Sequence, residues 1–360
     1  MGIGAGMDYR SLGTSGLNVP AMGLGTANFS GGTAPATGIG DKLAARLVDL
    51  AIERGAAFFD TADIYGAAEE VLGKALAKRR SQAMIATKAG LRCGPGPNDT
   101  GATRHHLTQS VERSLRRLGT DYIDLFLIHS FDGRTPPEES LSALDALIRA
   151  GKLRAIGCSN YAGWQLMKSL AVSERRGWPR FAAHQIAWSL AARDAEWELA
   201  PLAADQDVAN LVWAPLAGGA LSGRYGRGGR PFAALRYPAG LLGGIGEGQL
   251  QTVVDCLGEI AREAGVSQPQ VALAWLLQRP TVATVFTGAS SAEQLEANLD
   301  APDVRLTGDQ LARLDEVSAR PAPFPHTLQR GPGAERIARP GGGGANVRVD
   351  RALGVATPAP

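Results

Sequence analysis

The sequence predicts an α/β protein in which eight parallel strands and their connecting helices close into one (β/α)8 TIM barrel. Short apolar runs alternate with amphipathic stretches, and the runs lack the polar alternation of strands that face water on one side. Polar residues follow the ends of several runs, as they do where barrel strands open into a shared mouth. The expected strands are Ala21–Thr26, Ala56–Asp60, Ala83–Thr87, Asp124–His129, Leu153–Cys158, Ala182–Gln185, Asn210–Ala214 and Val282–Thr287.

Further elements complete this plan, with the barrel expected over residues 8–320. An N-terminal β-hairpin is predicted over Tyr9–Pro20, and an extra helix over Thr307–Ala319 follows the last strand. The Gly/Pro-rich residues 331–360 are expected to form a flexible, disordered tail, because they cannot bury enough apolar surface to offset the cost of ordering. Helices are expected in the connections, for instance over Lys42–Arg54, Glu69–Lys78, Thr103–Leu118 and Pro137–Ala150.

Two doubly wound halves are the alternative arrangement of alternating strands and helices. A dinucleotide domain of that kind opens its first helix with a G-x-G-x-x-G turn. The nearest match begins at Gly23 and lacks the third glycine. The barrel is therefore favoured. Loops as long as the glycine- and arginine-rich stretch Pro215–Gly248 tend to be functional lids or disordered, and a functional role is expected for this one.

Composition excludes several classes of protein. The 360 residues carry 37 basic and 35 acidic side chains without a basic block, so no electrostatic surface for nucleic acid is indicated. No apolar run approaches the roughly 18 residues that would cross a membrane, and the first residues do not resemble a signal peptide. Three cysteines without C-x-x-C spacing indicate neither a disulfide framework nor a zinc site, and a cytoplasmic location is expected.

The strongest candidate for chemistry is the group Asp60, Tyr65, Lys88 and His129, which lies at or just beyond the ends of three successive strands. A phenol with a pKa near 10 is a poor acid at neutral pH. A neighbouring ammonium stabilises the phenolate, and an aspartate beside the lysine holds that ammonium charged and oriented. A neutral histidine can position a carbonyl oxygen by donating a hydrogen bond. Taken singly, an aspartate here is more typical of a turn, a lysine of solvent exposure and a histidine of simple burial. Together the four residues indicate a catalytic proton donor.

These residues also carry a family resemblance. Eight segments that contain these residues or follow them in the chain resemble the signatures of the aldo-keto reductase superfamily, in particular its bacterial, NADP-dependent oxidoreductases. The resemblance extends over residues 8–320. The family implies a (β/α)8 barrel that reduces aldehydes and ketones with NADPH, less often NADH, and without a metal. Tyr65 would then be the general acid, Lys88 and Asp60 its partners, and His129 the orienting residue. The matching segments are Phe59–Gly66, Ala86–Lys88, Asp124–His129, Gly157–Asn160, His184–Ser189, Trp213–Gly219, Leu221–Tyr225 and Thr287–Ser291.

The resemblance also implies how the cofactor is held. Ser159, Asn160 and Gln185 would hydrogen-bond the nicotinamide carboxamide, and Trp188 would stack beneath the ring. The long loop would wrap the pyrophosphate through Leu216, Gly218, Ser222 and Arg224. The adenosine end would lie at the start of the last barrel helix, against Gly288, Ser290, Gln294 and Asn298.

Ser290 departs from the family pattern, because many relatives carry arginine or lysine there to bind the 2′-phosphate of NADPH. The expectation is that NADPH is preferred and NADH tolerated. The partner is expected to be a small-molecule carbonyl compound, with no nucleic acid and no membrane. Loop tips set the substrate, and the sequence does not identify it; a monomer or weak homo-oligomer is expected.

Two other functions remain open. Some relatives of this superfamily are channel-associated subunits that bind NADPH and sense redox state with little turnover. A metal-assisted barrel hydrolase would need clustered histidine and carboxylate ligands at strand ends, and only His129 lies at one. His105 and His106 are expected in the solvated first turn of a helix, with no ligand at metal spacing, and nothing adjacent marks Cys93 as a nucleophile.

Overall fold

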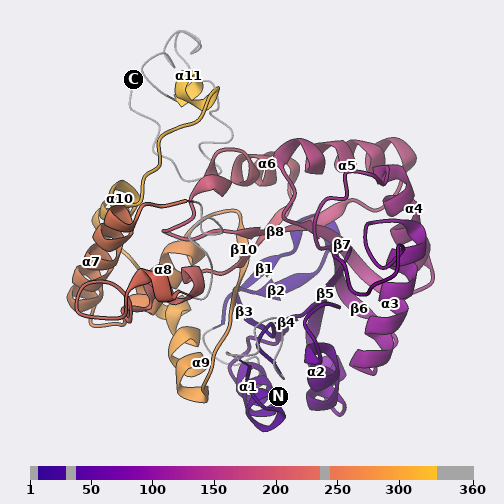
Figure 1. The fold of residues 1–360 in the computed structure, drawn as a ribbon, viewed down its shortest axis with the longest axis horizontal. Helices are drawn as coiled ribbons and strands as arrows, with labels where there is room; N and C mark the ends of the chain where they lie inside the picture. The colour runs from indigo at the N-terminus through magenta and orange to yellow at the C-terminus, as the bar shows by residue number, and fades with distance from the viewer. Residues whose placement is uncertain (1–6, 30–37, 236–243, 331–360) are drawn as a thin grey trace.

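The computed structural model of the protein describes residues 7–29, 38–235 and 244–330. Eight parallel strands form a closed barrel in the order β10-β3-β4-β5-β6-β7-β8-β9 (Figure 1). This confirms the predicted (β/α)8 fold, and each expected strand is found with bounds that differ by at most two residues. The strands are β3 (Met22–Gly25), β4 (Phe58–Asp60), β5 (Met84–Ala89), β6 (Ile123–Ile128), β7 (Leu153–Ser159), β8 (Phe181–Ala187), β9 (Ala209–Trp213) and β10 (Val282–Thr287).

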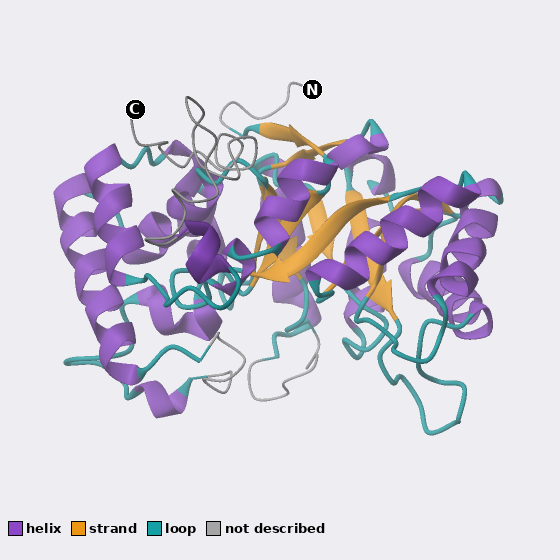
Figure 2. Ribbon diagram, turned by 90° about the horizontal axis from the view of Figure 1, so that it is seen from above, coloured by secondary structure: helices purple, strands orange, loops and turns teal. Residues whose placement is uncertain are grey.

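Helices surround this barrel (Figures 1 and 2). Two of their predicted caps are present, since the Thr103 and Thr307 side chains accept hydrogen bonds from backbone N–H groups at the starts of their helices. The helices are α1 (Asp41–Glu53), α2 (Ala68–Leu76), α3 (Arg104–Leu118), α4 (Pro137–Arg149), α5 (Gly163–Arg176), α6 (Leu199–Gln206), α7 (Glu247–Ala264), α8 (Gln268–Leu277), α9 (Ala292–Leu299), α10 (Gly308–Val317) and α11 (His326–Arg330).

The hairpin of β1 (Tyr9–Ser11) and β2 (Asn18–Pro20) covers the end of the barrel at which the strands begin. Leu12 and Val19 are fully buried in the same apolar cluster as the inward-facing strand residues. Gly13 lies so close to the start of β8 that an added Cβ would come within 2.3 Å of the Ala182 carbonyl oxygen. The hairpin therefore closes this end and leaves the opposite end for a site.

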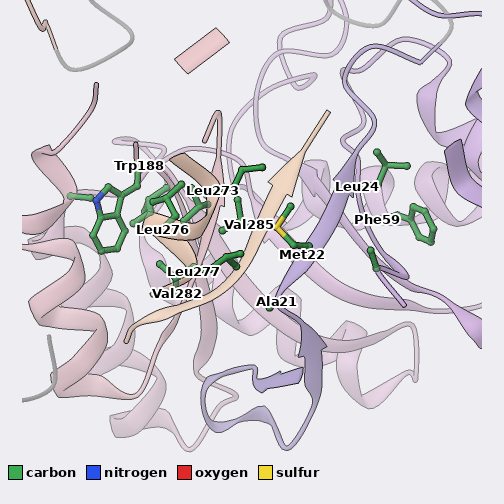
Figure 3. Packing of buried hydrophobic residues seen from close by; sticks show 14 of the residues in the cluster. Ala21, Met22, Leu24, Phe59, Trp188, Leu273, Leu276, Leu277, Val282 and Val285 are labelled. Atoms are coloured by element: carbon green, nitrogen blue, oxygen red, sulfur yellow. The ribbon is translucent and has the colours of Figure 1, made fainter. Parts of the chain in front are cut away.

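The apolar core has two layers because alternate strand residues point to opposite faces. An inner cluster fills the barrel with residues such as Phe58, Leu125 and Leu211. A larger cluster lies between the strands and the helices, and Figure 3 shows part of it. This division matters for the site, because any residue two positions beyond an inner apolar residue also points inward.

The structure differs from one expectation, on His106, and does not describe the residues of another, the tail. His106, expected in a solvated turn, is buried with 1% of its surface exposed. The expected tail at 331–360 and residues 236–243 of the long loop lie outside the described residues. Within the described part of the chain, none of the helices combines the length and apolarity that a membrane crossing requires.

Candidate active site

Strand register brings Asp60, Lys88 and His129 to one end of the barrel interior. The residue two positions before each of them belongs to the inner apolar cluster, so all three share that inward face. Each lies at or near the carboxyl end of its strand, β4, β5 or β6. Tyr65 reaches the same place from the loop between β4 and α2, where its backbone N–H donates to the Ala62 carbonyl oxygen at 3.1 Å.

Lys88 connects the carboxylate and the phenol. Its Nζ lies 2.8 Å from the Asp60 carboxylate, donates to the Thr61 carbonyl oxygen at 2.7 Å and lies 3.5 Å from the Tyr65 hydroxyl. The side chain is fully buried. Burial alone would lower the pKa of Lys88, but the charges of Asp60 and Tyr65 and the hydrogen bonds to them raise it above its ordinary value. Lys88 is therefore held as an ammonium.

His129 is held in the opposite, neutral state. Burial and, secondly, the charge of Lys88 lower the pKa of His129 to about 3. Its ring centroid lies 6.0 Å from that of Tyr65, with the rings nearly perpendicular. Among the described residues its Nδ1 has no hydrogen-bond partner. The imidazole is thus a neutral group beside the phenol.

A cavity of about 650 Å³ opens over these groups. Asp60, Tyr65 and His129 line it, whereas Lys88 lies behind them, closed off from it. Strands β7 to β10 and the segments that follow them supply most of the remaining wall. Ten of the predicted cofactor residues also line the cavity, namely Ser159, Asn160, Gln185, Leu216, Gly218, Ser222, Arg224, Gly288, Ser290 and Gln294.

Three polar residues beside the catalytic candidates form a connected group. Gln185 donates through Nε2 to Asp60 Oδ1 at 2.6 Å, and its carbonyl oxygen accepts from the Ser159 hydroxyl at 3.1 Å. Asn160 donates through Nδ2 to the His129 carbonyl oxygen at 3.1 Å and adopts a left-handed backbone, with φ 58°. These contacts hold the amide groups rigidly at the cavity wall.

The segment after β9 presents backbone to the cavity. It forms a 3-10 turn, η5 (Ala217–Ser222), interrupted by Gly218 and Gly219 with φ of 65° and 104°. Glycine suits these left-handed positions, and without a Cβ the backbone stays open to close approach. Ser222 ties the turn together by donating to the Gly219 carbonyl oxygen at 2.6 Å. Arg224 follows and is the one lysine or arginine among the described residues that line the cavity.

The start of α9 forms another part of the wall. Ser291 caps the helix by accepting from the Gln294 backbone N–H at 3.2 Å, and the Ser290 hydroxyl lies 2.9 Å from Gln294 Oε1. Asn298 corrects the sequence expectation. It is 3% exposed, donates through Nδ2 to Thr287 Oγ1 and does not line the cavity, because it faces the barrel from the second turn of the helix.

Trp188 is a second correction. Expected to stack beneath a nicotinamide ring, it is instead 2% exposed, packs edge-on to Trp275 and donates through Nε1 to Glu196. Figure 3 draws it within the packed outer cluster. The tryptophan at the cavity wall is Trp213, at the end of β9, whose Nε1 donates to Asn160 Oδ1 at 3.0 Å. The signal was available, since Trp213 lies two positions beyond the inward-facing Leu211.

Known proteins are similar to this chain over most of its length. An uncharacterized oxidoreductase, YrpG, of Bacillus subtilis is 35% identical over 88% of this chain and 97% of its own length. A probable voltage-gated potassium channel subunit beta of Arabidopsis thaliana is 33% identical, and a versiconal hemiacetal acetate reductase of Aspergillus parasiticus is 32% identical, each over 86% of this chain and 96% of the relative. The model of the aldo/keto reductase family matches residues 21–319, and the chain therefore belongs to the aldo/keto reductase family of oxidoreductases.

Proposed function

We propose that the protein catalyses the reversible, NAD(P)H-dependent reduction of an aldehyde or ketone to the alcohol. The observation that carries this is the position of Lys88, fully buried between the Asp60 carboxylate and the Tyr65 hydroxyl. An ammonium in that place stabilises the phenolate that forms when Tyr65 gives up its proton. The phenol itself lines the cavity, where a substrate oxygen can reach it.

Tyr65 acts as the general acid toward the carbonyl oxygen. The Lys88 ammonium stabilises the negative charge left on the phenol, and Asp60 keeps that ammonium in place. His129, neutral because of burial, donates a hydrogen bond to the same oxygen and limits the positions that it can take. In the oxidative direction Tyr65 takes the proton back from the alcohol.

The cavity wall fits a nicotinamide dinucleotide. When bound in reduced form, this cofactor supplies the hydride for the carbonyl carbon. Gln185 and Asn160 offer amide groups to the carboxamide, and Trp213 offers a flat apolar face for the ring. The open glycine backbone of η5 and the charge of Arg224 suit a pyrophosphate, and the N-terminus of α9 favours the anionic groups at the adenosine end.

Cofactor choice follows from the charges on this wall. Ser290 donates a hydrogen bond but carries no charge, so a 2′-phosphate would gain less there than from a cation. The preference for NADPH follows from the family resemblance, and the missing charge at Ser290 makes NADH a tolerated cofactor.

A cofactor-binding regulatory subunit with little turnover is the alternative, favoured by the similarity to the probable potassium channel subunits. Incubation with NADPH and a panel of aldehydes, followed by absorbance of the reduced nicotinamide, separates the two. A reductase consumes NADPH in an aldehyde-dependent, saturable manner. NADPH that quenches tryptophan fluorescence but is not consumed by any aldehyde would favour the subunit, and absence of NADPH binding would contradict both.

A further inference from the structure

A second group of chemically reactive side chains lies outside the cavity. Asp63 follows β4, Cys93 lies in the loop after β5, and His106 lies in the first turn of α3. A carboxylate oxygen, the sulfur and a ring nitrogen of these residues all lie within 4.8 Å of one another. None of the three lines the cavity, and the reductase proposal uses none of them. We propose that Asp63, Cys93 and His106 form a zinc-binding site.

Asp63 provides the first independent observation. It is 5% exposed, and among the described residues neither oxygen of its carboxylate has a hydrogen-bond partner. A carboxylate buried in this way is costly unless an ion or a donor compensates it. The Arg117 guanidinium lies nearby but donates to the Asp63 backbone carbonyl and to Glu69 instead. A cation at the cluster would give the carboxylate the partner that it lacks.

His106 provides the second observation, because its ring is already oriented as a ligand. Its Nδ1 lies 3.1 Å from the Asn98 carbonyl oxygen, which can only accept, so Nδ1 carries the hydrogen. Nε2 then carries the lone pair, and its partner in the structure is the Cys93 sulfur at 3.9 Å. A carbonyl that fixes the tautomer of a histidine from behind is the usual outer contact of a metal-binding imidazole.

The donor set selects zinc. A thiolate and an imidazole favour Zn²⁺ over Mg²⁺ or Ca²⁺, which prefer oxygen ligands. Two zinc-bound ligands, sulfur and nitrogen, lie about 3.5 Å apart in tetrahedral geometry, so the Cys93–His106 separation needs only a small contraction. Three protein ligands leave the fourth position for water.

Binding of Zn²⁺ at the cluster would release protons from its ligands. Burial and then the charge of Asp63 raise the pKa of the Cys93 thiol, whereas Arg113, whose Nη2 donates to the sulfur at 3.4 Å, favours the thiolate. Burial, as the largest cause, raises the pKa of Asp63 to about 7, so the metal would displace protons from both Asp63 and Cys93, and the two negative charges then match one Zn²⁺. The metal would connect the β4–α2 loop, the β5–α3 loop and the start of α3, so its binding should raise the melting temperature.

The test uses the full chain without a histidine tag, treated with chelator, reduced and then titrated with Zn²⁺ alone by calorimetry. One equivalent is expected to bind and to raise the melting temperature. Titration with Co²⁺ is expected to produce the near-ultraviolet absorption of a thiolate-to-cobalt charge transfer. Absence of saturable Zn²⁺ binding, or a Co²⁺ spectrum without that band, would overturn the proposal.

Variants assign the ligands. Cys93→Ser, at an exposed position that does not threaten folding, should abolish the charge-transfer band, and His106→Gln and Asp63→Asn should each weaken Zn²⁺ binding at least about tenfold. The matched controls His105→Gln and Cys256→Ser should bind as the wild type does. Persistence of the charge-transfer band in Cys93→Ser would contradict the site, and so would equal losses of Zn²⁺ affinity in His105→Gln and His106→Gln. If His106→Gln does not fold, the Cys93→Ser result alone decides whether the site exists.

Discussion

The ammonium of Lys88 lies 2.8 Å from the carboxylate of Asp60, in an ion pair whose lysine is fully buried and whose carboxylate reaches the cavity wall with 8% of its side chain exposed. A buried pair of this kind is costly to form, and breaking it is costlier, because the remaining charge stays in the interior. The pair therefore contributes little as a stabilising device. Its consequence is chemical, since it keeps a full positive charge 3.5 Å from the Tyr65 hydroxyl.

Replacing Lys88 tests its effect on the free energy of unfolding and its effect on turnover separately. Lys88→Met leaves the Asp60 charge unpaired and should lower the free energy of unfolding by roughly 3–5 kcal/mol. It should also reduce kcat by at least about 10²-fold, because the phenol loses its supporting charge. The double variant Asp60→Asn/Lys88→Met should recover part of the stability but none of the turnover. Urea unfolding and steady-state kinetics measure the two effects, and recovered turnover in the double variant would contradict the assigned role of Lys88.

The protonation of His129 predicts a pH profile. With a pKa of about 3, far below its ordinary value, His129 stays neutral from pH 8 down to pH 5 and neither gains nor loses a proton there. The profile of kcat/KM should therefore show no inflection due to this residue, and His129→Gln should lower the rate without changing the shape of the profile. An acid limb near pH 6.5 in the wild type that disappears in His129→Gln would show that the histidine titrates after all.

Cofactor preference should respond to charge at the start of α9. Ser290→Arg places a cation where the wild type has a hydroxyl, and it should increase the ratio of kcat/KM for NADPH over NADH by at least about tenfold. The Ser291 cap is untouched, so the helix should keep its start. Strict use of NADH by the wild type would overturn the proposed preference, and an unchanged ratio in the variant would place the 2′-phosphate elsewhere.

The two tryptophans should behave differently. Trp213→Leu removes an aromatic face from the cavity wall and should raise the Kd for the cofactor about fivefold, as expected from the loss of roughly 1 kcal/mol of ring contact. Trp188→Phe alters the core and should leave that Kd nearly unchanged. Fluorescence titration or calorimetry gives both values. If Trp188→Phe weakened binding and Trp213→Leu did not, the present assignment of the cavity wall would be wrong.

The strands and much of the site could be predicted from the sequence because both depend on local regularities. Apolar runs locate the strands, and the alternation of strand residues places Asp60, Lys88 and His129 on the inward face. The same alternation points to Trp213. The sequence does not predict the position of Trp188, because this residue lies just beyond the end of β8, where alternation no longer decides which way a side chain points.

The remaining features depend on tertiary contacts. Asn298 faces Thr287 of the barrel and not the cavity because of how α9 packs, and helical periodicity alone does not say which element a helix face is buried against. His106 looks solvated in sequence because its neighbours are polar. Its burial comes from the β4–α2 and β5–α3 loops that fold over the start of α3, and loop conformations are not encoded in a periodic pattern.

Tyr65→Phe removes the hydroxyl that is proposed to supply the proton, and it changes one oxygen and little else. The variant should lose all measurable carbonyl reduction, a fall of at least about 10²–10⁴-fold in kcat, while its Kd for NADPH stays within about twofold of the wild type. Tyr161→Phe, at a buried tyrosine away from the cavity, is the matched control and should keep its activity. Turnover in Tyr65→Phe close to that of the wild type would show that a group other than Tyr65 supplies the proton.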